Sequence, residues 1–269
     1  MKKSSRESTR NVSCAGLLSL SSLLGSLLIS TLPAQSAPEA GWALTQTSKE
    51  ASMSGALTLY VTPTGMRSTD PKSGLNMFTK GPNWTIAIYN DKTRRIFQSP
   101  LQQWLVSFKA RGMSSRFDGA TWRRGREGQI AGVRAYEFIM DRPPPVRGNI
   151  KTINGKMKNL PTLTSATLWV AADISTPPQV SDLLSKMYGV PDCQRIPLRL
   201  TMVEAGNKVH TAVDTVRVGR VNVPDSVFTA PRSYQQVRQD SEVLIDKESM
   251  DTLDDMLKDL DTPAPRRRR

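Results

Sequence analysis

Apolar and polar residues alternate most clearly in a late stretch of the chain, Pro197 to Tyr234. The alternation from Leu198 to Val203 is typical of a β-strand with one buried face. Gly206 and Asn207 follow it, and because both residues adopt positive φ at low cost, they predict a tight turn. The alternation resumes after this turn, but its phase slips before Val216. This slip predicts a bulge or a sharp bend, as in sheets that curve around something.

Shorter alternating runs fill the first half of the chain and predict an antiparallel meander with short turns. We interpret the segment before them, residues 39–52, as a first helical turn around Trp42 and Leu44, and residues 64–68 as a connection. The strands of the meander are expected at residues 54–62, 75–80, 84–88 and 93–98.

The apolar period changes to that of a helix at two places. Pro100 suits the first turn of a helix, and the apolar residues from Leu101 to Phe108 recur at i, i+3, i+4 and i+7. A second helix begins near Pro177 and has one apolar stripe up to Gly189. Each stripe needs a sheet face to cover. Further strands are expected at residues 120–126, 133–140 and 165–172. Residues 141–164 form a long basic and proline-rich loop, and loops of this length are usually either mobile or functional.

The first residues have the features of an export signal. Four basic residues precede an apolar run from Ala15 to Leu32, and small residues follow it at Ala34 and Ser36. The rival interpretation is a membrane anchor, but five serines dilute the apolar run. We therefore expect a signal peptide at 1–37 and a protein exported to the periplasm or cell envelope, with secretion as an alternative. Cys193 is then the only cysteine left, so no internal disulfide is expected.

Charge divides the remaining chain into two parts. Residues 38–239 hold 27 Lys and Arg against 14 Asp and Glu, whereas residues 240–261 hold 9 acidic and 2 basic residues. We assign 38–239 to one folded domain and 240–269 to a flexible acidic extension that ends in Arg266–Arg269. Within the extension, Glu248–Leu260 predicts a short acidic amphipathic helix that needs a surface to dock on. Outside the cytoplasm, the basic body and the arginine tail favour anionic lipid or wall polymers over nucleic acid, and the alternative is a solvated surface.

Residues able to do chemistry are few. His210 is the only histidine. A catalytic pair of Cys193 with His210 would need a third group to orient the imidazole, and one histidine with one cysteine cannot supply the usual three or four ligands of zinc. The aspartates at 70, 91, 118 and 141 stand beside turn residues, which is their ordinary place. The sequence has no nucleophile elbow, phosphate loop or dinucleotide fingerprint. We therefore predict no catalytic residue, no metal and no cofactor. A hydrolase that uses separated carboxylates is a weak alternative.

Four segments together resemble the LolA-like group of exported half-barrel proteins, which includes lipoprotein carriers. They are WTIAIYNDKTRRIF, GQIAGVRAYEF, SATLWVAADI before a proline-started helix, and VNVPDSVFTAPRSYQQV after the last hairpin. The resemblance covers roughly residues 50–237 and implies an α+β fold, a strongly curved antiparallel half-barrel wrapped around two amphipathic helices. At about 5–6 residues per strand, a meander of this length predicts about 9–11 strands. The resemblance also implies a concave apolar cavity that takes a lipid, a lipoprotein acyl chain or another apolar ligand.

The residues expected to line this cavity are those of the inward-facing strands and the two helix stripes. The alternative is an envelope interaction protein with a filled core, which acts through its basic surface and acidic tail; an apolar lining predicts both equally. The candidate lining residues are Trp84, Ile86, Ile88, Trp104, Phe108, Leu168, Val170, Leu183 and Met187.

Overall fold

The structure is a computed structural model that describes residues 37–48, 55–110, 117–145, 150–151, 157–158 and 162–244, all within one unit, Ser36–Arg269. The predicted signal peptide, most of the 141–164 loop and nearly all of the acidic extension lie outside these residues. The descriptions below apply to the described residues.

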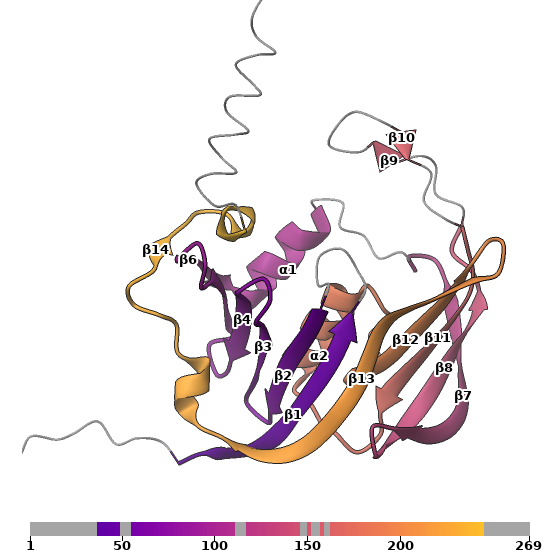
Figure 1. Ribbon diagram of the computed structural model, residues 1–269, viewed down its shortest axis with the longest axis horizontal. Coiled ribbons are helices and arrows are strands. Elements are labelled where there is room, and N and C mark those ends of the chain that lie inside the picture. Colours follow the sequence, from indigo (N-terminus) through magenta and orange to yellow (C-terminus); the bar gives the residue numbers. More distant parts are fainter. Residues whose placement is uncertain are drawn as a thin grey trace, which may run out of the picture. The chain divides into compact units, whose positions relative to one another are not determined.

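Most of the strands belong to one curved sheet of twelve strands (Figure 1). Its order is β14-β6-β5-β4-β3-β2-β1-β13-β12-β11-β8-β7, and neighbours are antiparallel except that β14 runs parallel to β6. Two further strands, β9 (Ile150–Lys151) and β10 (Met157–Lys158), form a small sheet of their own. The strands of the main sheet are β1 (Glu39–Ser48), β2 (Gly55–Thr62), β3 (Gly65–Asp70), β4 (Leu75–Lys80), β5 (Thr85–Asn90), β6 (Arg95–Pro100), β7 (Thr121–Ile130), β8 (Val133–Arg142), β11 (Leu163–Ala171), β12 (Pro197–Glu204), β13 (Lys208–Val223) and β14 (Gln235–Gln236).

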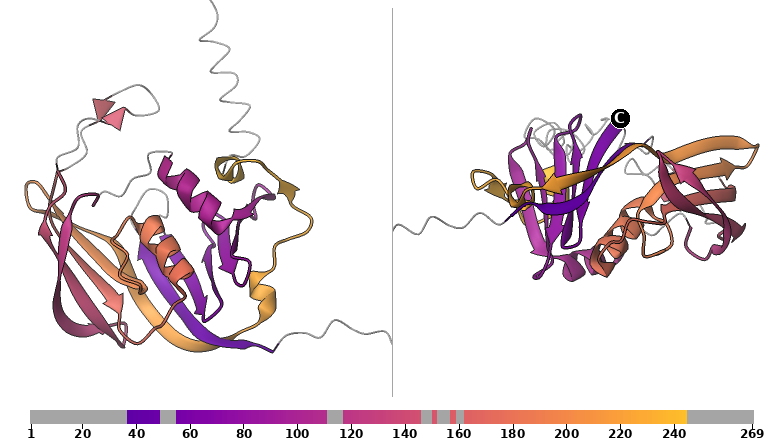
Figure 2. Two further views of the ribbon diagram at one scale, coloured as in Figure 1. Left: turned by 180° about the vertical axis from the view of Figure 1, so that it is seen from behind. Right: turned by 90° about the horizontal axis from the view of Figure 1, so that it is seen from below.

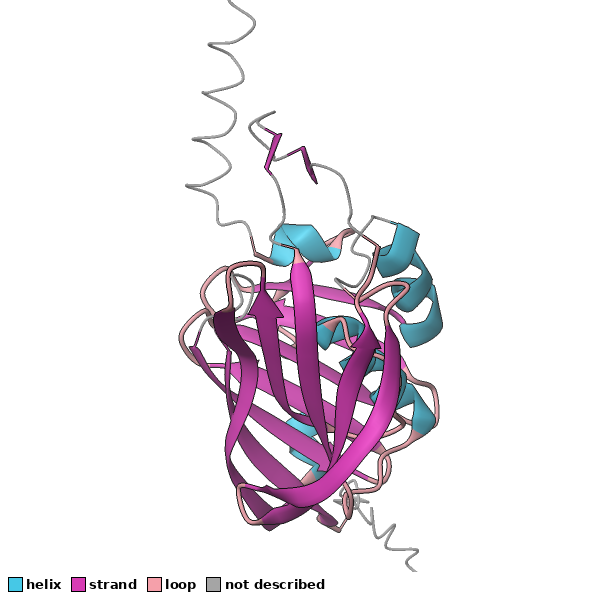
Figure 3. Ribbon diagram, turned by 90° about the vertical axis from the view of Figure 1, so that its right-hand side faces the viewer, coloured by secondary structure: helices cyan, strands magenta, loops and turns pink. Residues whose placement is uncertain are grey.

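Strand β13 joins the two halves of the sheet. It is 16 residues long and pairs with β12 through its first part and with β1 through its second. Register shifts at Leu200/Thr201 of β12 and Thr45/Gln46 of β1 mark the bends, and the predicted phase slip in β13 falls between them. As a result, the sheet is strongly curved and its concave face is open on one side (Figure 3). We refer to β1–β6 as the first half, and to β7, β8, β11, β12 and the start of β13 as the second half.

Both helices lie on the concave side of the sheet (Figure 2). Helix α1 (Leu101–Ala110) follows β6 directly after Pro100. Helix α2 (Pro178–Tyr188) has a proline in its first turn and ends at Gly189 in the left-handed conformation at φ 63°, where the chain leaves the helix.

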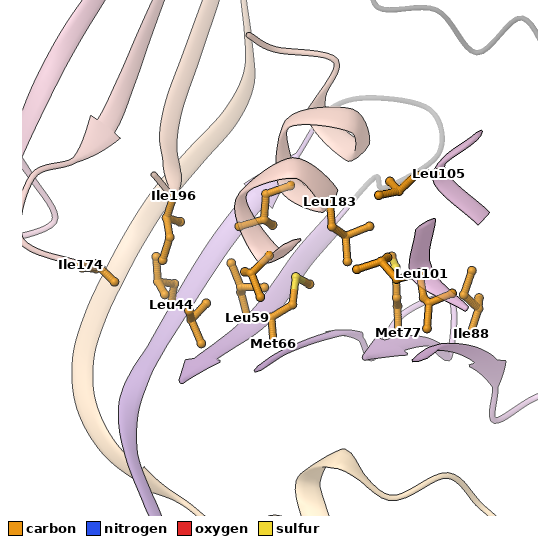
Figure 4. Close-up of a cluster of buried hydrophobic side chains, with 14 of the residues drawn as sticks. Leu44, Leu59, Met66, Met77, Ile88, Leu101, Leu105, Ile174, Leu183 and Ile196 are labelled. Atoms are coloured by element: carbon orange, nitrogen blue, oxygen red, sulfur yellow. The ribbon is translucent and has the colours of Figure 1, made fainter. Parts of the chain in front are cut away.

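The helices pack on the first half and make the main hydrophobic core (Figure 4). Leu44, Leu59 and Met66 from the sheet are fully buried beneath Leu101 of α1 and Leu183 of α2. Because these side chains come from elements far apart in sequence, this cluster holds the helices to the sheet.

The convex side of the first half is also covered. After β13 the chain continues through the 3₁₀ turn η1 (Asp225–Phe228) to Tyr234, and we call Pro224–Tyr234 the strap. Phe228 of the strap is buried against Phe78, and Tyr234 stacks edge-on against Tyr89 at 5.8 Å. The first half therefore has a core on each face.

The predicted α+β half-barrel is confirmed, since the sheet is curved, open and antiparallel with two helices inside it. The helix stripes and the late hairpin are also confirmed. Three details were wrong. Residues 39–48 are a strand rather than a helical turn, residues 65–70 are a strand rather than a connection, and the main sheet has twelve strands rather than 9–11.

Candidate functional site

The nine candidate lining residues fall into three surroundings. Trp84, with φ 46°, stands in the turn before β5 rather than in the strand. It packs against the core under the helices and also borders a pocket of about 650 Å³ that includes Asp225 and Phe228 of the strap. Leu168 and Val170 are fully buried in the second half. The remaining six belong to the core under the helices or pack against it: Ile86, Ile88, Trp104, Phe108, Leu183 and Met187.

The core between the helices and the first half is closely packed, and a pocket of about 460 Å³ lies beside it, between α1, the end of β6 and residues 238–240. Ile86 and Leu183 are fully buried, and Trp104 is 5% exposed. The indole of Trp104 stacks on Phe108 at 4.9 Å and donates a hydrogen bond to Asp240 at 2.7 Å. These side chains serve as packing between helix and sheet, so a ligand there would have to displace α1 or α2.

The concave face of the second half is different, because its aromatic residues are only half-buried. Trp122 lies on β7, and Tyr136 and Phe138 lie on the neighbouring strand β8. The β7–β8 register places Trp122 opposite Met140, so all of these side chains share one face of the sheet. We call Trp122, Tyr136 and Phe138 the aromatic face.

Buried aliphatic residues continue the aromatic face across the sheet. Phe138 is opposite Leu168 on β11, and Tyr136 is opposite Val170. Leu168 is in turn opposite Leu200 of β12, which is 2% exposed. The aromatic face thus borders a dry aliphatic floor, and large apolar surface beside such a floor is typical of ligand sites. The candidate lining residues predicted from the sequence include none of Trp122, Tyr136 and Phe138.

Two guanidinium groups lie against the aromatic face. The Arg124 guanidinium carbon is 3.9 Å from the centre of the Tyr136 ring, and that of Arg195 is 5.2 Å from the same ring. Arg195 is fixed by hydrogen bonds to the carbonyl oxygens of Ala171 and Ala172. Arg124 is 55% exposed and pairs with Glu127 at 3.0 Å, an exposed contact of small free energy. The border of the apolar surface is therefore positively charged on one side.

A buried polar contact fixes the end of α2 between the two halves. The Tyr188 hydroxyl donates to Gln46 Oε1, and Gln46 Nε2 donates to Pro197 O at 2.8 Å and to Thr215 Oγ1 at 3.0 Å. Burial raises the pKa of Tyr188, so it remains a neutral donor. This network joins α2 to β1, β12 and β13, which holds the helix at the edge of the aromatic face.

No strong catalytic arrangement emerges from the described residues. Burial, with a smaller contribution from Asp192, raises the pKa of Cys193 to about 11, so the group is a thiol rather than a nucleophilic thiolate at neutral pH. No group of three His, Cys, Asp or Glu residues suited to a metal ion occurs among the residues described. In the same ranges, none of the helices has the length and apolar character required to cross a bilayer.

The chain matches no protein-family model and no curated protein. Among solved structures it is similar to an uncharacterized conserved protein from Thermus thermophilus, with 14% identity, a TM-score of 0.40, and coverage of 74% of this chain and 90% of that one. It is also similar to MucB in the Pseudomonas aeruginosa MucA/MucB complex, with 10% identity, a TM-score of 0.32, and coverage of 74% and 59%, so this chain spans less than two thirds of that protein.

A third match is a putative outer membrane lipoprotein-sorting protein domain from Vibrio parahaemolyticus, with 10% identity, a TM-score of 0.28, and coverage of 71% of this chain and 89% of that one. None of these likenesses assigns a ligand to this chain. The sheet and helices described above confirm the predicted α+β half-barrel at the level of the fold.

Proposed function

We propose that this protein is exported and binds a lipid, a lipoprotein acyl chain or another apolar ligand on the concave side of its second half, without doing chemistry on it. The observation that supports this best is the half-buried state of Trp122, Tyr136 and Phe138 next to fully buried Leu168 and Val170. In a filled core these rings would be covered, as their counterparts are under α1 and α2. An apolar ligand that covered them would remove further apolar surface from water, at about 25 cal/mol per Å².

The proposed site therefore differs from the predicted one. Of the candidate lining residues, Leu168 and Val170 remain as its floor, and the aromatic face is added to them. The six candidates of the core under the helices take a packing role in this proposal. Trp84 packs against the same core and also borders the pocket beside the strap.

The second candidate function is an envelope interaction protein with a filled core. The complete burial of Leu101 on α1 and of Leu183 and Leu184 on α2 favours it, because the helices pack tightly on the first half of the sheet. Under this alternative the basic body and the acidic extension provide the contacts with the envelope, and the protein extracts no lipid.

The test uses two tryptophans of the second half that lie on opposite faces of the sheet. Trp122 belongs to the aromatic face. Trp169 is also half-buried, but it alternates onto the other face of β11 from Leu168 and Val170, where its ring lies over Gly128 and packs against the main core. We expect organic extracts of the purified protein to contain lipid by mass spectrometry, and the protein to bind the apolar dye N-phenylnaphthylamine. Trp122→Ala should weaken dye binding about tenfold or more, because it removes an aromatic contact of over 1 kcal/mol.

The matched control is Trp169→Ala, which should leave dye affinity within about twofold, with circular dichroism to verify that both variants are folded. Lipid-free extracts together with no dye binding by the unmodified protein would reject ligand binding and favour the interaction protein. Equal weakening by both substitutions would reject the aromatic face as the site.

A further inference from the structure

The last described segment of the chain crosses from the convex to the concave side of the sheet. The strap covers the convex face, and β14 then pairs with the edge of β6. Beyond β14, Val237 and Val243 belong to the concave core, where Val243 is fully buried. In Figure 1 this is the yellow segment that passes around β6 to the neighbourhood of α1. The acidic extension therefore starts at the rim of the concavity.

Several contacts fix this exit point. The Trp104 indole of α1 donates to Asp240 at 2.7 Å, and Thr93 Oγ1 donates to the Val243 carbonyl at 2.9 Å. Gln239 and Glu242 form a capping box around the 3₁₀ turn η2 (Asp240–Val243), in which the Gln239 N–H donates to Glu242 Oε1 at 2.8 Å. These contacts fix the end of the described chain beside α1 in a structured turn.

The sequence that follows matches the aromatic face in polarity and charge. Residues 246–261, which we call the acidic tail, hold seven acidic and two basic residues. Met250, Leu253, Leu257 and Leu260 recur at helical spacing on one side. A helix over 248–260 would be about 20 Å long. Alone it is too short to be stable in water, so it requires an apolar surface to fold on.

We propose that the acidic tail of this chain docks on the aromatic face of its own second half and occupies the concave site in the absence of ligand. Its apolar stripe covers Trp122 and Phe138, and its carboxylates lie near the Arg124 and Arg195 guanidinium groups. Arg124 is available for this role, because its existing pair with Glu127 is exposed and weak. The net charges are also opposite, since the body from 38 to 239 has 13 more basic than acidic residues.

Docking makes the tail an intramolecular competitor. A tethered segment meets its site at a high effective concentration, so an external ligand must displace it before it binds. This consequence rests on the proposed function, whereas docking itself rests on the exit point, the apolar stripe and the charges.

Hydrogen–deuterium exchange on the full chain without its signal peptide tests the docking. We expect amides of residues 248–260 to exchange at least about tenfold more slowly than an unstructured chain, and the protection to fall in 0.5 M salt, where charges are screened within a few Å. Leu253→Ser with Leu257→Ser should abolish that protection and speed exchange in β7 and β8. Arg124→Glu should also reduce it, because it places like charges in contact.

The matched control is Arg217→Glu, which reverses an exposed charge on β13 away from the aromatic face and should leave the tail protected. A tail that exchanges like an unstructured chain in the unmodified protein would overturn the proposal. An equal loss of tail protection in the Arg124→Glu and Arg217→Glu variants would also overturn the proposal.

Dye binding separates this proposal from the proposed function. If the tail competes, the Leu253→Ser, Leu257→Ser variant binds N-phenylnaphthylamine about tenfold more tightly than the unmodified protein. Equal affinity in both would overturn docking on this site and leave ligand binding intact. A protected tail with no dye binding by either protein would retain the docking and reject the proposed ligand site.

Discussion

At the scale of residues, two glycines of the β1–β13 ladder have opposite surroundings. A Cβ on Gly41 would lie 2.6 Å from the Val61 carbonyl oxygen and 3.0 Å from Thr62 Cγ2, both in the neighbouring strand. A Cβ on Gly219 meets no atom of the described residues within 4 Å. Gly41 is therefore required by close approach of backbone, whereas Gly219 only adds freedom to the unfolded chain.

We predict opposite effects of alanine at these two glycines. Gly41→Ala should lower the free energy of unfolding by about 1–3 kcal/mol, because the neighbouring strand must shift. Gly219→Ala should raise it by about 0.4–1 kcal/mol, because the unfolded chain loses conformations. Urea denaturation measures both, with the slope expected to stay constant. A Gly41→Ala protein as stable as the unmodified one would contradict the close approach.

The accessibility of individual apolar residues could not be predicted from their pattern. Ile86 and Phe138 both alternate with outward-facing neighbours, and both point to the concave side. Ile86 is fully buried because the helices dock over its half of the sheet, whereas Phe138 remains half-buried. Period 2 fixes which face a side chain takes, but the element that covers that face is decided by tertiary packing.

At the scale of elements, the strap depends on one arginine of β3. Arg67 Nη1 donates to the Val227 carbonyl of the strap at 2.6 Å, and Nη2 donates to Asn76 Oδ1 at 2.9 Å and to the Tyr89 hydroxyl. Its guanidinium carbon also lies 5.6 Å from the Tyr89 ring centre. A single planar group thus joins the strap to β4 and β5, in the geometry that arginine provides and lysine does not.

We predict that Arg67→Met loosens the strap and lowers the free energy of unfolding by about 2–4 kcal/mol, because the buried side chains of Asn76 and Tyr89 lose charge-assisted hydrogen bonds. Limited proteolysis should then cut within residues 224–234 well before the sheet unfolds. Arg94→Met is the control, because Arg94 contacts the strap only weakly, by an exposed hydrogen bond of 3.3 Å to Ser233 and by its guanidinium 5.6 Å from the Tyr234 ring centre. It should change stability by less than about 1 kcal/mol. Equal protease resistance of the two variants would contradict the role of Arg67.

The elements that the sequence missed are those whose buried face is not apolar throughout. In β1, Trp42, Leu44 and Gln46 face the concave side, and Gln46 is fully buried because its amide bonds to Pro197 and Thr215. A buried glutamine interrupts the apolar alternation, so the pattern did not predict a strand. The long hairpin and both helices were predicted correctly, because their apolar patterns extend over many residues.

At the scale of the whole sheet, the two halves differ in how they are covered. The first half has helices on its concave face and the strap on its convex face. The second half has a concave face that is partly open at Trp122, Tyr136 and Phe138. Because local opening costs less where fewer apolar contacts are broken, the halves should differ in local stability although they share one sheet.

We predict that native-state hydrogen exchange resolves this difference. Strands β4 and β8 make a matched pair, since each has a hydrogen-bonded neighbour on both sides. Amides of β4 should exchange at least about tenfold more slowly than those of β8, and a bound apolar ligand should narrow the gap by protecting β8 alone. Equal protection of both strands would mean that the sheet opens only as one cooperative unit. In that case the local stability of the aromatic face would equal that of the helix-covered core, and ligand binding there would have to be explained by shape alone.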